Sequence, residues 1–294
     1  MAPKVVVITG CSTGIGLETA ALLASDKDNR FKVFATMRNL AKQAQLEIAA
    51  GSTLDKTLFI RQLDVTKEDS IVEFIDKINR EEGGVDILIN NAGVGQAGVV
   101  EKVAMSQIRT VYETNVFGLI RLTQAVIPGM KSKRAGHIIN VGSMAGLFGY
   151  PFCDIYVSSK FAVEGFSESI APLLKKFNIS VSVIEPGPVQ TAFAGNIATN
   201  DTGRFSSEAE IDADVDEKTR QYYKDSFARA EKRSSTIMQT GAEIASIIQD
   251  AILSDNPHLH YPTSEVMGKL AASKYIDPTG DSVLRNLSAQ QQWE

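Results

Sequence analysis

Apolar, β-branched runs alternate with longer amphipathic segments along the first two thirds of the chain. Several of these runs are nearly continuous rather than strictly alternating, which is typical of strands covered by helices on both faces. The pattern predicts six strands, at 4–9, 31–37, 57–64, 85–91, 136–142 and 180–186, and a weaker seventh at 258–262.

Helix-length segments separate the strands, at 14–25, 67–82, 106–131 and 154–176. A strand, a helix and a further strand repeated in this way indicate right-handed crossovers and a parallel sheet. We therefore predict one α/β domain over 1–294, doubly wound and Rossmann-like, with a mostly parallel sheet of about seven strands and helices on both faces. Pro172 is expected to kink or split the last of these helices, because proline lacks the N–H of the helical hydrogen bond.

A long polar stretch follows the sixth strand. Residues 188–216 contain glycine and show no clear periodicity, and 216–233 then has a charged helical pattern. Long loops in compact domains are commonly functional. We therefore interpret 188–235 as a substrate lid over the strand ends and 264–294 as a C-terminal tail.

Charge and composition narrow the class of protein. The 294 residues carry a formal net charge of -5, which argues against a nucleic-acid partner because little would neutralise a row of phosphates. Cys11 and Cys153 have neither disulfide nor metal-ligand spacing, which favours a reducing compartment and a cytoplasmic location. No apolar run approaches the length of a transmembrane segment, and peripheral membrane contact stays open.

A glycine-rich loop, "TGCSTGIG", lies between the first strand and the first helix. Glycines at these positions permit a tight turn and bring backbone N–H groups close to a phosphate, and the helix N-terminus favours negative charge. The loop alone could be structural, but its position after a strand and before a helix predicts a dinucleotide site. Its candidate contacts are Gly10, Ser12, Thr13, Gly14, Ile15 and Gly16.

Arg38, at the end of the second predicted strand, indicates which dinucleotide binds. No acidic residue lies between Phe31 and Leu46 to hold a free ribose 2′-hydroxyl, whereas an arginine there can bind a 2′-phosphate. NADP(H) is therefore predicted over NAD(H). The alternative is an exposed arginine with no ligand at the end of the strand.

Two further candidate contacts, Asp64 and Val65, follow the third predicted strand, where an adenine ring could bind. Asp64 could equally cap the next helix, a role that Thr66 fills as well. Both interpretations stay open at this point.

The motifs together resemble the short-chain dehydrogenase/reductase family. The glycine loop, "NNAG", Asn115 in "YETNVFG", Ser143 in "INVGS", "YVSSK" and "IEPGPVQT" occur in the family's order, over at least 4–193. Within the family, "FKVFATMRN" and "EPGPVQTAF" are most similar to the branch of 17β-hydroxysteroid dehydrogenase type 1 and the photoreceptor retinol dehydrogenases.

The resemblance implies roles for a catalytic group of Asn115, Ser143, Tyr156 and Lys160. Tyr156 would be the acid/base, Ser143 would orient the substrate oxygen, and Asn115 would support a helix distortion or a water near Lys160. A phenol ordinarily titrates near pH 10, so we expect the Lys160 cation to lower its pKa. Taken alone, a tyrosine and a lysine one turn apart would more simply pack and reach water. Further cofactor contacts are implied at Asn91, Ala92, Gly93, Tyr156, Lys160, Gly187, Val189 and Thr191.

The predicted substrate site is mostly apolar or aromatic, which suits a lipophilic alcohol or ketone. Its candidate residues are Ser143, Leu147, Tyr150, Pro151, Phe152, Tyr156 and Phe193. We predict a 17β-hydroxysteroid or 17-ketosteroid, and a retinoid or a broader lipophilic carbonyl substrate stays open. The steroid enzyme has a histidine in its lid helix, but 216–227 has none here, and Arg220, Tyr222 and Tyr223 could replace its contacts.

No metal site is expected. His137, His258 and His260 have no acid or cysteine at ligand spacing, so we interpret all three as structural. The resemblance also implies a homodimer through the helices at 106–131 and 154–176. An alternative of another class is a catalytically silent protein that senses NADP(H), although such a protein need not keep both Tyr156 and Lys160.

Overall fold

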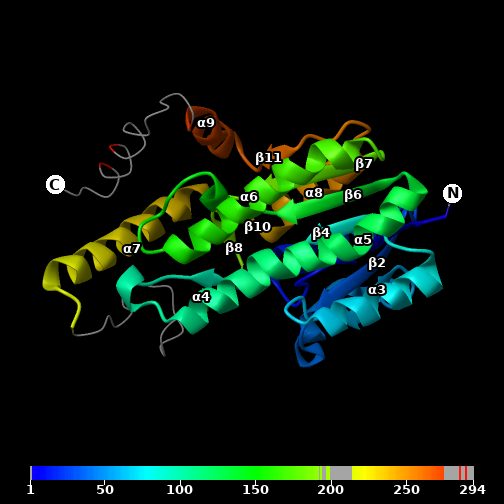
Figure 1. Cartoon of the computed structure of the whole chain (residues 1–294), viewed down its shortest axis with the longest axis horizontal. Helices are drawn as coiled ribbons and strands as arrows, with labels where there is room; N and C mark the ends of the chain where they lie inside the picture. The colour runs from blue at the N-terminus through cyan, green and yellow to red at the C-terminus, as the bar shows by residue number, and fades with distance from the viewer. Residues whose placement is uncertain are drawn as a thin grey trace.

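The computed structural model describes residues 2–191, 193, 197–198, 214–274, 285 and 289. Its centre is a seven-stranded sheet in the order β11-β7-β6-β4-β1-β2-β3, and every neighbouring pair is parallel (Figure 1). The strands are β1 (Lys4–Ile8), β2 (Phe31–Met37), β3 (Leu58–Gln62), β4 (Ile87–Asn90), β6 (Gly136–Val141), β7 (Ile179–Glu185) and β11 (His260–Pro262). The predicted Rossmann-like fold in a single domain is confirmed.

Helices cover both faces of the sheet (Figure 1). One face carries α1 (Gly14–Ala24), α2 (Ala44–Ala50) and α8 (Gly241–Leu253), and the other carries α3 (Glu68–Glu82), α5 (Leu119–Lys133) and α6 (Asp154–Lys175). Strand order reverses between β1 and β4, so the crevice of a doubly wound fold opens at their carboxyl ends.

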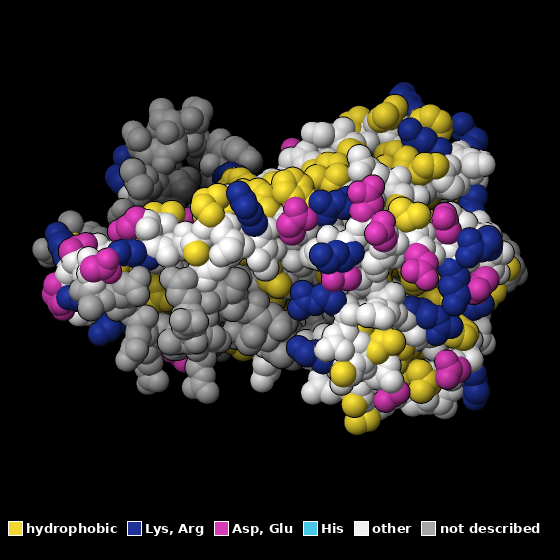
Figure 2. Space-filling model, turned by 60° about the horizontal axis from the view of Figure 1, so that its bottom comes forward, with side chains coloured by type: hydrophobic (Ala, Val, Ile, Leu, Met, Phe, Trp, Pro, Cys, Tyr) yellow, Lys and Arg dark blue, Asp and Glu magenta, His cyan; other side chains and the backbone are white. Residues whose placement is uncertain are grey.

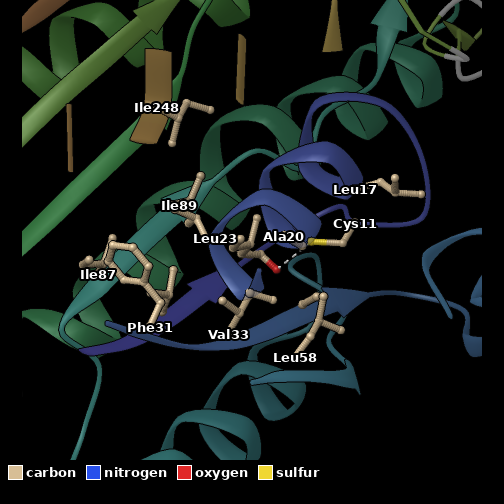
Figure 3. Close-up of a cluster of buried hydrophobic side chains, with 14 of the residues drawn as sticks. Cys11, Leu17, Ala20, Leu23, Phe31, Val33, Leu58, Ile87, Ile89 and Ile248 are labelled. Atoms are coloured by element: carbon tan, nitrogen blue, oxygen red, sulfur yellow. Dashed lines mark hydrogen bonds between the residues drawn. The ribbon is translucent and has the colours of Figure 1, made fainter. Parts of the chain in front are cut away.

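The two hydrophobic layers explain the continuous apolar runs of the strands. Val6 and Ile8 of β1 pack with α1 and α8, whereas Val5 and Val7 pack with α3 and α5. Successive strand residues point to opposite faces, so a strand covered on both sides needs an apolar residue at every position. Figure 3 shows the first layer, in which Leu23 of α1 and Ile248 of α8 lie near the strands.

The predicted helix at 106–131 is three elements in the structure. α4 (Met105–Tyr112) continues into a π-helix, η4 (Glu113–Gly118), and then into α5. A short π-helix adds a single extra residue to a turn of an otherwise continuous helical segment, which is why the pattern predicted one helix.

Pro172 does not split α6, which continues unbroken to Lys175. The expected split was therefore wrong. Pro172 stands in the last turn, where its missing N–H removes a single hydrogen bond from a long helix that packs on β7 and β6.

Further elements surround the carboxyl ends of the strands. The charged segment forms α7 (Glu217–Ile237), and α9 (Glu265–Ser273) follows β11 within the segment predicted as a tail. Two short parallel pairs join β8 (Val189–Gln190) with β10 (Gln239–Thr240) and β5 (Gly95–Gln96) with β9 (Ile197–Ala198). Short 3-10 turns are η1 (Leu40–Lys42), η2 (Gly51–Thr53), η3 (Val100–Lys102) and η5 (Met144–Gly146).

The surface in Figure 2 mixes both signs of charge, with Lys and Arg side chains beside Asp and Glu side chains. Such a face lacks the basic stripe that a phosphate backbone requires. In the part of the chain that the structure describes, no helix combines the length and the apolar character needed to cross a bilayer.

Candidate active site

A cavity of about 1250 Å³ opens at the carboxyl ends of β1, β2, β4, β6 and β7. It is large enough for a dinucleotide and a second molecule beside it. The predicted cofactor residues that line it are Gly10, Ser12, Thr13, Gly14, Ile15, Arg38, Asp64, Val65, Asn91, Ala92, Gly93, Tyr156, Lys160, Gly187, Val189 and Thr191. The structure thus brings together positions that are far apart in the sequence.

The glycine loop is packed tightly against the segment that follows β4. Asn91 donates from Nδ2 to the carbonyl oxygens of Thr9 at 2.8 Å and Gly10 at 3.1 Å. A β-carbon built on Gly10 (φ +73°) would lie 2.8 Å from Cα of Ala92, and one on Gly16 would lie 2.4 Å from Nδ2 of Asn91. Gly16 therefore holds the loop in place without lining the cavity itself.

The N-terminus of α1 fits an anion. Its N-cap residue, Thr13, makes no side-chain cap hydrogen bond, so the first N–H groups of the helix are left without a side-chain acceptor. Gly14 (φ +62°) stands beside Thr191, 3.1 Å from the position of a β-carbon. An uncapped helix end behind a glycine turn fits a diphosphate.

Arg38, Asn39 and Lys42 line the same cavity beyond β2. Arg38 is exposed, and no ion-pair partner for its guanidinium occurs among residues 2–191 and the later residues that the structure describes. Two cations at this end of the cavity suit a phosphate group.

Asp64 does not cap α3, whose N-cap residue is Lys67, but it fixes a turn and lines the cavity. Its Oδ1 accepts hydrogen bonds from the backbone N–H of Thr66 at 3.0 Å and from the Thr66 hydroxyl at 2.7 Å. The carboxylate thus fixes the turn before α3, whose N-cap is Lys67. Asp64 also lines the cavity beside Val65, so it is available to an adenine ring.

Tyr156 and Lys160 lie one turn apart on α6 and face the cavity together. The lysine Nζ is 5.8 Å from the centre of the tyrosine ring. Enclosure by protein raises the pKa of Tyr156 to about 12, although the Ser143 hydroxyl acts in the opposite direction. The pKa of Tyr156 is therefore raised here, not lowered as the sequence analysis expected.

Lys160 is buried, and its Nζ donates to the carbonyl oxygen of Val141 at 2.8 Å. Burial lowers the pKa of Lys160 to about 8, and the nearby Glu164 carboxylate raises it. The amine is thus held by β6 rather than by the Tyr156 hydroxyl, which accounts for the weak effect of the lysine on the phenol.

Ser143 follows β6 and begins η5. Its Oγ accepts a hydrogen bond from the backbone N–H of Ala145 at 3.0 Å and lies 3.5 Å from the carbonyl oxygen of Pro186. The hydroxyl thereby satisfies a local backbone group and still lines the cavity near Tyr156.

Asn115 is buried in the π-helix and supports the site from behind. Its side chain accepts from the backbone N–H of Val94 at 2.8 Å and donates to the Val94 carbonyl oxygen at 2.9 Å and to Ser159 Oγ at 3.0 Å. It ties the segment after β4 to α6, and the helix distortion implied by the resemblance is present at this residue.

The substrate side of the cavity is lined by Tyr150, Pro151 and Phe193, and the Phe193 ring lies 5.7 Å from that of Tyr156. Leu147 and Phe152 are not among the lining residues. Phe152 packs on Tyr223 of α7 at 5.1 Å, so Tyr223 is buried in an apolar cluster instead of reaching the cavity.

Sequence reasoning missed the apolar contribution of the last helices. The further lining residues are Ser226, Phe227 and Ala230 of α7 and Val266, Met267 and Leu270 of α9. The helical spacing of the apolar residues Phe227, Ala230 and Ile237 was the available signal for α7. For α9 the sequence offers no signal, because its contact with the site depends on the position of β11.

The histidines differ in their surroundings. His137 is buried, its Nε2 lies 2.9 Å from Ser182 Oγ, and burial lowers the pKa of His137 to about 4. His260 instead lies against acids that are distant in the sequence, with Nδ1 2.7 Å from Glu185 Oε1. The expectation that His260 lacks a partner acid was wrong, because spacing along one segment cannot show neighbours from α6 and β7.

The chain matches the short chain dehydrogenase family over residues 4–202. It is 42% identical to retinol dehydrogenase 8 of Bos taurus over 97% of this chain and 89% of that protein. It is 37% identical to 17-beta-hydroxysteroid dehydrogenase type 1 of Homo sapiens, covering 96% and 84%. Among solved structures, ElxO with NADP bound superposes with a TM-score of 0.70 at 26% identity, covering 88% of this chain and 96% of that one.

The family match covers the glycine loop, the β4 segment and the Tyr156–Lys160 pair, and the relatives extend the similarity to nearly the whole chain. The cavity has the glycine turn and the uncapped helix end that a nicotinamide dinucleotide needs. The chain therefore belongs to the short-chain dehydrogenase/reductase family and is an NAD(P)-dependent oxidoreductase that acts on CH–OH groups.

Proposed function

We propose that the protein uses NADP(H) to interconvert a lipophilic alcohol and its carbonyl compound, with a 17β-hydroxysteroid and its 17-ketosteroid as the first candidate pair. One observation carries the proposal. Tyr156 and Ser143 line the same cavity as the glycine loop and as the apolar side chains of α7 and α9. A reacting oxygen beside Tyr156 would thus lie between a dinucleotide and a dry pocket.

Tyr156 is the proposed acid/base and Ser143 the group that holds the substrate oxygen. With a pKa of about 12 the phenol keeps its proton near neutrality and can donate it to the oxygen of a carbonyl compound. The bound nicotinamide would exchange hydride with the carbon of that carbonyl. Lys160 on α6 and Asn115 on η4 are proposed to position Tyr156 and Ser143.

NADP(H) is proposed over NAD(H) because Arg38 and Lys42 line the end of the cavity beyond β2. A 2′-phosphate would gain charge-assisted hydrogen bonds there, and the segment has no carboxylate to bind a free 2′-hydroxyl. The solved relative ElxO, which holds NADP, is consistent with this choice.

The substrate class is argued from the lining. Phe193, Phe227, Val266, Met267 and Leu270 supply an apolar wall of the size a steroid or retinoid needs. A retinol/retinal pair is the second candidate, favoured by the higher identity to retinol dehydrogenase 8 than to the steroid enzyme. Broader reduction of lipophilic carbonyl compounds is the less selective form of the same proposal.

The remaining features of the proposal concern the setting of the enzyme. Cys11 and Cys153 are free thiols whose pKa values are raised to about 12 by burial, which suits a cytoplasmic location with peripheral access to membrane-dissolved substrate. Two copies are proposed to associate through α4–α5 and α6. The lid predicted at 188–235 lies partly outside the described residues, and its described helix α7 is proposed to cover the substrate.

The proposed activity is tested by NADPH oxidation with estrone, androstenedione, all-trans-retinal and a small polar aldehyde. We expect turnover of at least one lipophilic carbonyl compound, and a loss of about 100-fold or more in kcat for Tyr156→Phe. Tyr112→Phe, which removes a phenol hydroxyl outside the cavity, is the matched control and should stay active. NADPH binding without any turnover would favour the silent sensor instead.

A further inference from the structure

A buried group of acids lies behind the active site, on the side of α6 that faces β7 and β11. Glu164 of α6, Glu185 at the end of β7 and His260 of β11 meet there. His260 Nδ1 is 2.7 Å from Glu185 Oε1 and 3.7 Å from Glu164 Oε2. Its other ring nitrogen is 3.5 Å from Glu168 at the surface.

The two carboxyl groups are unusually short of partners. Glu164 is 5% exposed and Glu185 is 1% exposed. Neither oxygen of Glu164, nor Oε2 of Glu185, has a hydrogen-bond partner in the described part of the chain. Burying two carboxylates side by side is costly when, among the described residues, one histidine is their only ion-pair partner and three of their four oxygens lack hydrogen bonds. The cluster of Glu164, Glu185 and His260 is therefore stable in the folded protein only if it holds a proton or gains a positive charge.

The fold makes room for the Glu164 carboxyl directly beneath the catalytic segment. A β-carbon on Gly142 would lie 2.6 Å from Glu164 Oε1, and one on Gly146 would lie 2.8 Å from the same atom. These two glycines flank Ser143, and Val141 before them accepts the hydrogen bond of Lys160. The carboxyl thus occupies space that side chains at 142 and 146 would otherwise fill.

We propose that Glu164 is a positioning residue whose carboxylate, once ionised, holds the buried Lys160 in its ammonium form at alkaline pH, with the ionisation of Glu164 set by His260 and Glu185. The inference rests on the proposed role of Lys160 beside Tyr156. Glu164 stands one turn after Lys160 on the same face of α6, while His260 reaches solvent with about a third of its side chain exposed. A surface imidazole is thereby connected electrostatically to the catalytic lysine.

The charges that face Glu164 come from three elements and act in opposite directions on its ionisation. Burial, followed by Glu185, raises the pKa of Glu164 to about 8, and Glu168 adds to the rise. His260 and Lys160 oppose it. Glu185 in turn raises the pKa of His260, so the imidazolium persists to higher pH than usual. A protonated His260 favours the Glu164 carboxylate, and that carboxylate favours the Lys160 ammonium.

The direction of the expected change in the pH dependence of kcat follows from the charges around Lys160. Burial lowers the pKa of Lys160 and Glu164 raises it, so removing the carboxylate must lower it further. We expect Glu164→Gln to move the loss of kcat at high pH downward by about one unit. His260→Gln should move it in the same direction by less, because Glu164 then ionises later. His260→Arg keeps a cation and should retain the wild-type profile.

The experiment measures kcat against pH from 6 to about 10 for these variants with NADPH. Glu73→Gln, the same change at an exposed site on α3, is the matched control. A direct readout without substrate is the Cε resonance of Lys160 in ¹³C-lysine-labelled protein, whose titration should shift downward in Glu164→Gln. If that variant does not fold, the His260→Gln and His260→Arg pair decides the same question.

Unchanged kcat profiles and lysine titration in Glu164→Gln would overturn the inference, even if Tyr156→Phe abolishes turnover. An inactive wild type would instead refute the proposed function, and the lysine titration would still test the coupling. The three side chains could also bind a divalent cation. If Zn²⁺ or Mg²⁺ raised the thermal midpoint of the wild type but not of Glu164→Gln, these side chains would form a metal site and the proposed coupling to Lys160 would be overturned.

Discussion

Arg38 is the residue on which cofactor choice depends most directly. It stands at the carboxyl end of β2, exposed and lining the cavity beside Lys42. We predict that Arg38→Asp reduces NADPH affinity by about 10- to 100-fold, because a charge-assisted bond is lost and a repulsive carboxylate is gained. Affinity for NADH should rise or stay constant, since a carboxylate can accept from a free 2′-hydroxyl.

Fluorescence titration of NADPH and NADH measures both affinities. Arg38→Lys is the informative control, because lysine keeps the positive charge but cannot form the bidentate hydrogen bonds of arginine with a phosphate. It should weaken NADPH binding by less than the aspartate variant. An unaltered NADPH affinity in Arg38→Asp would remove this residue from the cofactor site.

At the residue scale, sequence reasoning worked where the chemistry is local. The glycine loop and the Tyr156–Lys160 spacing carry their meaning within a few positions. It failed where neighbours come from separate elements. His260 meets Glu164 and Glu185 only because β11 pairs with β7 and α6 packs on them. The raised pKa of Tyr156 likewise depends on enclosure, which spacing does not report.

The π-helix η4 is the element that links the segment after β4 to α6. It leaves Asn115 pointing at both backbone groups of Val94 and at Ser159 of α6. We predict that Asn115→Leu destabilises the protein by about 2 to 4 kcal/mol, because buried backbone groups of Val94 lose their partners. The value of kcat should fall by about tenfold or more, since the segment at 93–94 is freed.

Urea unfolding and steady-state kinetics of the same samples separate these two effects. Ser159→Ala removes only one of the three bonds and should show a smaller loss of both quantities. Wild-type stability and turnover in Asn115→Leu would show that the π-helix does not support the site.

The boundaries of helices and strands were predictable where a single hydrophobic pattern runs through the whole element. The central strands, such as β1 and β4, were found because both of their faces are buried, so apolar residues run without interruption. The π-helix and the continuous course of α6 through Pro172 were not, since local preference is overruled by packing on the sheet. The helix α8 was not predicted, although its apolar residues pack on α1.

Over the whole molecule, the parallel order of strands places the motifs at one edge of the sheet, so the fold and the cofactor half of the site follow from the sequence. The substrate half depends on α7 and α9, which return to the cavity from the far end of the chain. The approach of α9 is a tertiary contact with no local signature, whereas α7 offered only its helical spacing. The absence of histidine from 216–227 therefore did not show which side chains line the substrate half of the cavity.

The outer helices leave an apolar surface that bears on the assembly of the molecule. Met105 of α4 is 60% exposed, Phe117 of η4 is 44% exposed, and Phe161 and Leu173 of α6 are 38% and 59% exposed. Since α4 and η4 contact α6, these side chains belong to neighbouring helices. A two-fold association through this surface would bury each of these side chains in both copies of the chain.

We predict that the wild type sediments at twice the 31.8 kDa chain mass at micromolar concentration, and that Leu173→Asp sediments as the single chain. Burial of a leucine contributes about 1.5 to 3 kcal/mol to the free energy of association. In a two-fold interface this contribution is lost at two positions, and each aspartate adds the cost of a buried, unpaired charge. Ile48→Asp, at an 82% exposed position on α2, is the matched control and should stay dimeric. A monomeric wild type, or dissociation of both variants alike, would exclude association through α4 and α6.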